Sequence, residues 1–137
     1  MNQKRVLFLC TGNSARSQLA EALLRHIGGE RFTAASAGTE PRAAVHPDAL
    51  ATLEHHGVPA AGLAPKHIAT FDGAAPFDLV ITVCDRAHHA CPVMPGATML
   101  HWSFPDPAEV VAATERRRAF EGVFAELSAR IAELVRA

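Results

Sequence analysis

Apolar residues follow two kinds of pattern along this chain, and the first kind is a short unbroken run. Two runs are strongly apolar, one at Arg5–Cys10 and one at Asp78–Val83. Weaker runs cover Phe32–Ala37 and Ala97–Trp102. Continuous apolar runs of this length are typical of strands that are buried on both faces. The pattern therefore predicts four strands.

The second pattern is a recurrence of apolar residues at every third or fourth position, which indicates amphipathic helices. One helix is predicted from Ser17 to about Ile27, where two glycines end it. Another begins at Pro47 and ends before Gly57. A third is predicted from about Pro107 onward, with its apolar positions at Phe120, Val123, Phe124, Leu127, Ile131 and Leu134.

The order of these elements along the chain predicts an α/β fold. Strands alternate with helices, which favours a three-layer domain built on a parallel sheet with helices on both faces. No repeat or composition shift divides the sequence, so we expect a single domain over residues 1–137. Ligands of such folds bind beyond the carboxyl ends of the strands, where Cys10 and Cys84 both lie.

The segment between Cys10 and Arg16 is a short polar loop at a strand–helix junction. Gly12 and Asn13 tolerate left-handed backbone, so the loop can turn its N–H groups inward toward an anion. Arg16 adds a fork of donors that matches two oxygens of a tetrahedral oxyanion, and the helix from Ser17 adds its positive end. We expect this field to lower the pKa of Cys10 and to make it a nucleophilic thiolate. The alternative is a buried packing cysteine before an ordinary loop.

Composition and charge narrow the range of partners. The chain has 137 residues, of which 49% are hydrophobic, and a formal net charge of −1. A chain so close to neutral does not attract nucleic acid or an anionic membrane through bulk electrostatics, so neither is expected as a partner. The apolar run after Lys4 and Arg5 is too short for a signal peptide or a membrane span, and we expect a cytoplasmic protein.

Three cysteines are present, at positions 10, 84 and 91. An odd number in a reducing compartment does not indicate a disulfide framework, which leaves packing, metal binding or redox chemistry. Cys84 and Cys91, with His88 and His89 between them, could ligate a metal. Structural zinc sites usually have tighter cysteine spacing and a fourth ligand, so we expect no bound metal. Inert packing of both cysteines stays open as an alternative.

The run from Val6 to Ser17 resembles the phosphate loop of the low-molecular-weight protein tyrosine phosphatases. It is still more similar to that of the arsenate reductases built on the same fold. The resemblance extends in order along nearly the whole chain, through Ser36–Thr39, His46-Pro47, Val83-Cys84, Cys91-Pro92, Trp102 and Asp106-Pro107. It implies a four-stranded parallel sheet with strand order 2-1-3-4.

The resemblance also implies a role for each matching residue. Cys10 is then the nucleophile, Arg16 clamps the oxyanion and Ser17 hydrogen-bonds the thiolate. Asp106 is the general acid that protonates the departing oxygen, although Asp beside Pro is also common in ordinary turns. The N–H groups that bind the substrate, arsenate or its mimics phosphate and sulfate, come from Thr11, Gly12, Asn13, Ser14 and Ala15.

The cysteine pair distinguishes the two activities of this superfamily. A phosphatase resolves its thiol intermediate with water, whereas a reductase needs a second thiol. The resemblance to the thioredoxin-linked arsenate reductases implies a role for each of these cysteines. Cys84 attacks Cys10 and releases arsenite, and Cys91 then attacks Cys84, which leaves a Cys84–Cys91 disulfide for thioredoxin. Ala108 stands where the phosphatases have an aromatic residue that stacks on phosphotyrosine. We therefore expect a monomeric, thioredoxin-coupled arsenate reductase; a phosphatase and a non-catalytic oxyanion sensor are the alternatives.

The chain departs from the family pattern at a few positions. Ala15 replaces a cysteine that many arsenate reductases have in the loop, and Pro105 replaces an aspartate before Asp106. Some relatives bind potassium near the residues that match Asn13 and Ser36. Here Lys66 brings a cationic side chain to that neighbourhood, so we expect no tight potassium site.

Overall fold

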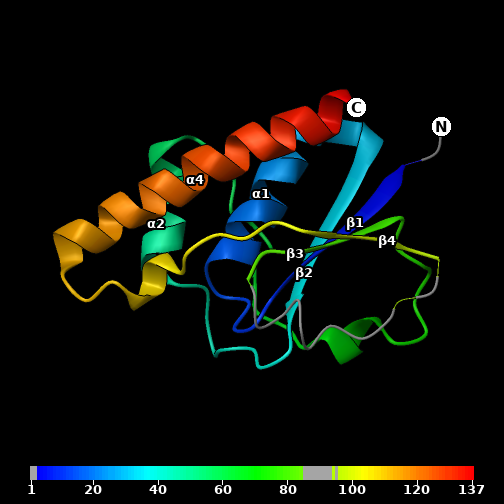
Figure 1. Ribbon diagram of the computed structural model, residues 1–137, viewed down its shortest axis with the longest axis horizontal. Coiled ribbons are helices and arrows are strands. Elements are labelled where there is room, and N and C mark those ends of the chain that lie inside the picture. The colour runs from blue at the N-terminus through cyan, green and yellow to red at the C-terminus, as the bar shows by residue number, and fades with distance from the viewer. Residues whose placement is uncertain (1–2, 85–93, 95) are drawn as a thin grey trace.

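The sheet of this protein is parallel and four-stranded. The computed structural model describes residues 3–84, 94 and 96–137. Its strands are β1 (Lys4–Cys10), β2 (Phe32–Gly38), β3 (Leu79–Thr82) and β4 (Thr98–His101), in the order β2-β1-β3-β4 (Figure 1). All three pairings are parallel. The predicted strands and their order are thus confirmed.

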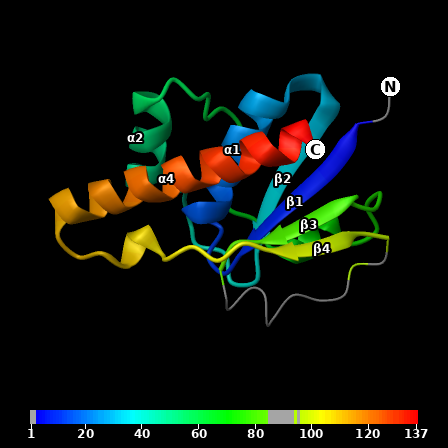
Figure 2. The same ribbon diagram turned by 45° about the horizontal axis from the view of Figure 1, so that its top comes forward.

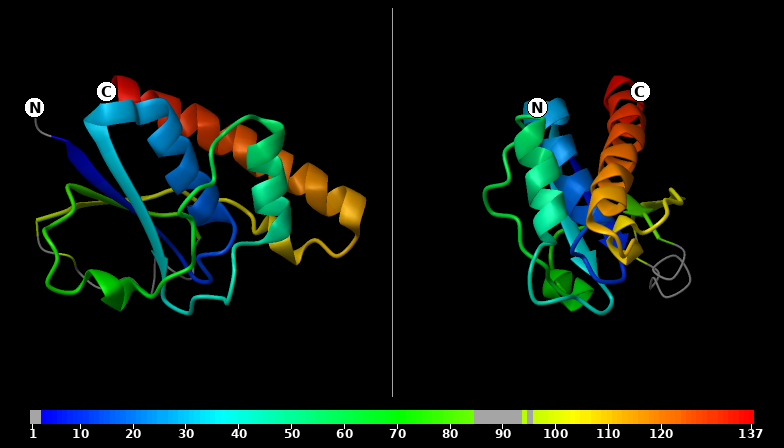
Figure 3. Two further views of the ribbon diagram at one scale, coloured as in Figure 1. Left: turned by 180° about the vertical axis from the view of Figure 1, so that it is seen from behind. Right: turned by 90° about the vertical axis from the view of Figure 1, so that its left-hand side faces the viewer.

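In the part of the chain that the structure describes, the α-helices beside the sheet are α1 (Arg16–Gly28), α2 (Pro47–His55) and α4 (Ala113–Arg136). They gather on one side of the strands, where α4 packs along α1 and the shorter α2 packs against α4 (Figure 2). On the other side of the strands lies the 3₁₀ helix η2 (Ile68–Phe71), seen below the sheet in Figure 3. Two further 3₁₀ helices are η1 (Gly29–Arg31) and η3 (Pro107–Glu109).

The start of the last helix differs from the prediction. Residues from Pro107 form only the 3₁₀ turn η3, and the chain is extended at Val110 and Ala112 before α4 begins at Ala113. The Asp106 side chain caps this turn by accepting a hydrogen bond from the N–H of Ala108. Asp106 therefore caps a short turn and not the start of the long helix.

Burial explains why the strongest apolar run lies in the middle of the sheet. Val6, Leu7, Phe8 and Leu9 of β1 are all fully buried, because both faces of this strand are covered. The edge strand β4 is mostly exposed, which fits its weaker apolar pattern. No helix among the residues described combines the length and the apolar character that crossing a membrane requires.

Strand register brings distant residues to one edge of the sheet. Cys10 pairs with Gly38 of β2, and Leu9 pairs with Thr82 of β3. The N–H of Val83 donates to the carbonyl of Leu9 at 2.8 Å, which continues this pairing beyond β3. Cys84 therefore follows directly alongside the end of β1.

Gly38 makes the close approach between β2 and the loop after β1. A Cβ at this position would lie 2.5 Å from the Thr11 carbonyl oxygen, a backbone atom that cannot easily move. We predict that Gly38→Ala lowers the free energy of unfolding by about 1–3 kcal/mol, because the added methyl group overpacks the junction. Urea denaturation of the variant and the parent protein measures this difference.

Gly122→Ala is the matched control for this substitution. Gly122 lies within α4, and a Cβ added there has no neighbouring atom within 4 Å. The same change should here raise the free energy of unfolding by about 0.5–1 kcal/mol, since alanine is the better helix former. Equal stability of Gly38→Ala and the parent would contradict the close-approach argument.

Candidate active site

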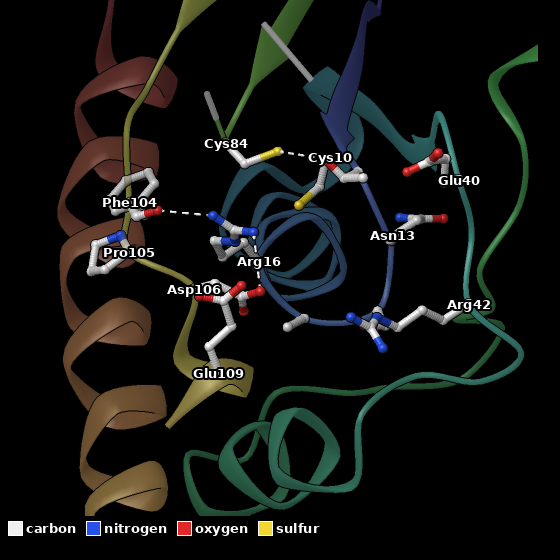
Figure 4. Close-up of a pocket in the computed structure, with 14 residues that line it drawn as sticks. Cys10, Asn13, Arg16, Glu40, Arg42, Cys84, Phe104, Pro105, Asp106 and Glu109 are labelled. Atoms are coloured by element: carbon white, nitrogen blue, oxygen red, sulfur yellow. Dashed lines mark hydrogen bonds and ion pairs between the residues drawn. The ribbon is translucent and has the colours of Figure 1, made fainter. Parts of the chain in front are cut away.

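A cavity of about 410 Å³ opens at the edge of the sheet where β1 and β3 end. It brings together most of the predicted site residues: Cys10, the loop residues Thr11, Gly12, Asn13, Ser14 and Ala15, Arg16, Cys84 and Asp106. Figure 4 shows Cys10, Cys84, Arg16 and Asp106 around its interior. Cys91 lies outside the described residues, as do His88 and His89.

Hydrogen bonds to its carbonyl groups set the orientation of the loop after Cys10. Each of four carbonyl groups in succession accepts a hydrogen bond, at 2.8 or 2.9 Å. The donors are the N–H of Glu40 to Thr11, the N–H of Arg42 to Gly12, the Gln18 side-chain amide to Asn13 and the N–H of His46 to Ser14.

A carbonyl fixed in this way also fixes the N–H of the next residue. In a trans peptide unit the C=O and N–H bonds point in opposite directions. The N–H groups of the residues from Gly12 to Ala15 therefore turn away from their neighbours and toward the cavity. Converging N–H groups next to a helix N-terminus form an anion site, which is the arrangement expected from the sequence.

Asn13 holds the loop from inside. It is fully buried and has φ of 48°, in the left-handed region that asparagine tolerates. Its side-chain amide donates to Ser17 Oγ at 2.8 Å and to Ser36 Oγ at 2.9 Å, and its Oδ1 accepts from the N–H of Lys66 at 2.9 Å. One side chain thus joins the loop to α1, β2 and the segment before η2.

Ser17 lies beneath the loop and is fully buried. Because its Oγ accepts a hydrogen bond from Asn13, the hydroxyl hydrogen is left to donate to another group. This arrangement suits the predicted role of Ser17 as a donor to the Cys10 thiolate. That role stays a prediction.

The neighbourhood expected to repel a potassium ion contains a cationic group. Lys66 Nζ donates to the carbonyl of Ser36 at 3.0 Å and to that of Ala64 at 2.8 Å. It lies 3.9 Å from Glu21, a carboxylate that accepts from the Ser36 hydroxyl at 2.6 Å and pairs with Arg25. The Lys66 ammonium thus contributes a positive charge to a buried polar cluster behind the loop.

Arg16 is the first residue of α1 and reaches across the cavity. Its Nη1 donates to the carbonyl of Phe104 at 2.9 Å, and its Nη2 lies 3.5 Å from Asp106 Oδ2. Its Nε is buried and has no hydrogen-bond partner among the described residues. A buried donor without a partner is costly. A bound oxyanion that accepts a hydrogen bond from this Nε would remove that cost.

Asp106 is placed where both of the roles that the sequence left open are geometrically possible. Its Oδ1 caps η3, which is the role of a turn residue, and its Oδ2 faces Arg16 in the cavity. The side chain is about one-fifth exposed, so protons can exchange with solvent. A carboxyl group so placed can donate a proton to an oxygen bound by Arg16.

Two thiols meet at the wall of the cavity. Cys10 and Cys84 are both buried, at 3% and 4% exposure, and no disulfide joins these two residues. Thr11 Oγ1 lies 3.3 Å from Cys84 Sγ, and this contact ties Cys84 to the start of the loop. The parallel pairing of β1 with β3 is the cause of this meeting.

The expectation of a lowered Cys10 pKa is wrong for this arrangement of two thiols. The hydrogen bond with the Cys84 thiol raises the pKa of Cys10, and burial and the charge of Cys84 raise it further. Arg16 and the N–H of Thr11 act in the opposite direction. The sequence argument considered only the loop and Arg16, whereas two adjacent thiols compete for one negative charge.

Four residues of the cavity were missed in the sequence analysis: Glu40, Arg42, Phe104 and Glu109. Glu40 and Arg42 follow β2 and donate their N–H groups to the loop carbonyls. Their spacing of two, shortly after Gly38-Thr39, was an available but weak signal. Phe104 contributes through its backbone carbonyl, for which a side-chain motif gives no signal.

Comparison with known proteins places this geometry in a family. The family model for the low molecular weight phosphotyrosine protein phosphatases matches residues 5–137. An arsenate reductase of Shouchella clausii is 35% identical over 135 residues, which cover 96% of this chain and 94% of that protein.

Solved structures with the same fold include two arsenate reductases. The thioredoxin-dependent arsenate reductase of Corynebacterium glutamicum has 32% identity and a TM-score of 0.74, covering 96% of this chain and 60% of that one. An arsenate reductase of Archaeoglobus fulgidus has 32% identity and a TM-score of 0.73, covering 96% and 99%. The chain is therefore a member of the low molecular weight phosphotyrosine protein phosphatase family and is closely similar to its arsenate reductases.

Proposed function

We propose that this protein reduces arsenate to arsenite with two electrons from its own thiols. The observation that carries the proposal is the Cys84 thiol beside Cys10 in an anion-binding cavity. A hydrolase of this fold needs only water to resolve a Cys10 intermediate. A second buried thiol in contact with the nucleophile supports reduction instead.

The first step is attack of Cys10 Sγ on arsenate held by the loop N–H groups and Arg16. Because the pKa of Cys10 is raised, the thiol passes its proton to an arsenate oxygen as it attacks. A bond forms between Cys10 Sγ and arsenic, and one arsenate oxygen leaves as water after it accepts protons, the last from Asp106. Arg16 and the N-terminal end of α1 stabilise the charge of the remaining oxygens.

The second step uses Cys84. Its thiolate attacks Cys10 Sγ, the sulfur–arsenic bond breaks, and its electron pair reduces As(V) to As(III), which leaves as arsenite. A disulfide between Cys10 and Cys84 results. Cys91 then attacks Cys84 and frees Cys10, leaving a Cys84–Cys91 disulfide for an external dithiol.

Thioredoxin is the reductant that we propose for this last disulfide, with no bound cofactor required. The support is the similarity to the thioredoxin-dependent enzyme of Corynebacterium glutamicum and the presence of a third cysteine, Cys91. We further propose that the protein is a cytoplasmic monomer. We propose no nucleic-acid or membrane partner, because the net charge is near neutral.

Hydrolysis of phosphomonoesters is the second candidate function, because Cys10, Arg16 and Asp106 suffice for it and the family bears a phosphatase name. The cavity is poorly suited to an aryl ester. Ala108 stands at the position of the family's aromatic residue and is not among the residues that line the cavity. The aromatic side chain of Phe104 is buried. A small inorganic oxyanion requires no such wall.

Cys84→Ser separates these two activities. We predict that the variant loses multiple-turnover arsenate reduction, because no second thiol remains to expel arsenite. Oxidation of NADPH in the presence of arsenate, thioredoxin and thioredoxin reductase measures it. Hydrolysis of a small phosphomonoester without an aryl ring, which needs only Cys10, Arg16 and Asp106, serves as the control for an intact site. Full arsenate turnover in Cys84→Ser would overturn the relay.

Asp106→Asn tests proton donation at the same cavity. We predict a fall in kcat of about 10²–10⁴-fold, because the amide cannot protonate the departing oxygen. Glu109→Gln is the matched control, since Glu109 lines the cavity and is not placed against Arg16. An unchanged kcat in Asp106→Asn would show that another group protonates the departing oxygen.

The thiol pair makes a prediction about pH. Since Cys84 is the largest cause that raises the pKa of Cys10, its removal should lower that pKa and shift alkylation of Cys10 to lower pH. The rate of iodoacetamide modification between pH 5 and 10 compares the Cys84→Ala/Cys91→Ser protein with Cys91→Ser alone. Coincident pH profiles would show that the two thiols do not interact.

A further inference from the structure

A cluster of metal-ligating side chains lies where α2 meets α4 and is formed by His55, His56 and Glu121. His55 Nδ1 lies 2.9 Å from Glu121 Oε1, and His56 Nε2 lies 2.6 Å from Glu121 Oε2. The three ligand atoms all fall within 4.8 Å of one another. The proposed arsenate chemistry uses none of these residues.

Local backbone structure explains how two consecutive histidines reach one carboxylate. Neighbouring residues in a continuous helix point about 100° apart. Here α2 ends at His55, and His56 leaves the helical conformation with φ of −96° and ψ of 6°. The end of the helix therefore lets both imidazole rings turn toward α4.

The cluster is held in place from one side and open from the other. The His56 ring stacks on Phe124 of α4, with the ring centres 4.2 Å apart and an interplanar angle of 16°. Phe124 is buried, so this contact fixes the ring. The His55 side chain is 72% exposed, which leaves solvent access for an ion.

We propose that His55, His56 and Glu121 form a binding site for a divalent transition-metal ion of the zinc type, which fastens α2 to α4. Two imidazole nitrogens and one carboxylate suit Zn²⁺ and its neighbours in the first transition row, whereas Ca²⁺ and Mg²⁺ prefer oxygen alone. In tetrahedral zinc sites with bonds of 2.0–2.2 Å the ligand atoms lie about 3.3–3.6 Å apart. Ligand atoms that already lie within 4.8 Å of one another reach this spacing through small side-chain rotations. Water takes the fourth position.

The site gives α2 a second attachment to α4. At its N-terminal end α2 already joins α4 through Asp48, which accepts from Arg116 Nε at 2.7 Å. The histidine cluster lies at the opposite end. With an ion bound, both ends of α2 would be attached to α4. The ion would also raise the stability of the folded state, since the ligands come together only on folding.

The test is a zinc titration by calorimetry at pH 7.5, on chelator-treated full-length protein from which any affinity tag has been removed. We expect the parent to bind one equivalent that His55→Ala and Glu121→Gln lose or bind about tenfold or more weakly. The exposed His26 of α1 provides the matched control, His26→Ala, which should bind like the parent. Zinc held by the cysteine thiols contributes equally to all four proteins.

A second readout identifies the residues directly. In NMR spectra of the histidine side chains, zinc should shift the ring signals of His55 and His56 and leave those of His26 in place. It should also raise the Tm of the parent and not that of His55→Ala. Equal zinc affinity in all four proteins, or ring signals of His55 and His56 that do not move, would overturn the proposal and leave the cluster as a hydrogen-bonded contact between helices.

Discussion

The parallel pairing of β1 with β3 is the constraint on which the rest of the site depends. It aligns Leu9 with Thr82, so the residues that follow, Cys10 and Cys84, leave the sheet side by side. The two cysteines are far apart along the sequence. Cys84 comes 73 positions after Thr11, the neighbour of Cys10 that it contacts. The burial of β1 on both faces stabilises this register, because a shift by one residue would move each side chain to the opposite face and disrupt its packing.

Around this register the loop gains its function from what surrounds it. Backbone donors from the segment after β2 fix the loop carbonyls, and the Asn13 side chain fixes the loop from within. The N–H groups are thereby directed at a ligand before it binds. Such preorganisation reduces the cost of binding a charged substrate, because no dipoles need to reorient during the reaction.

Much of this could be predicted from the sequence, and the failures have physical causes. Strand runs and the Cys10–Arg16 spacing are local signals, so the sheet and the loop were predicted correctly. The pKa of Cys10 depends on a contact with Cys84, and local reasoning gave it the wrong direction. The His55–Glu121 contact crosses between two helices, so no local pattern in the sequence indicates it, and no metal was expected.

The central claim is that Cys84 receives the oxidation that begins at Cys10. The most direct measurement mixes reduced protein with one equivalent of arsenate, without thioredoxin, then alkylates the remaining thiols and maps the disulfide by mass spectrometry. We predict a Cys84–Cys91 disulfide with Cys10 alkylated, and a Cys10–Cys84 disulfide in the Cys91→Ser variant. Three alkylated cysteines, or a disulfide that excludes Cys84, would contradict it.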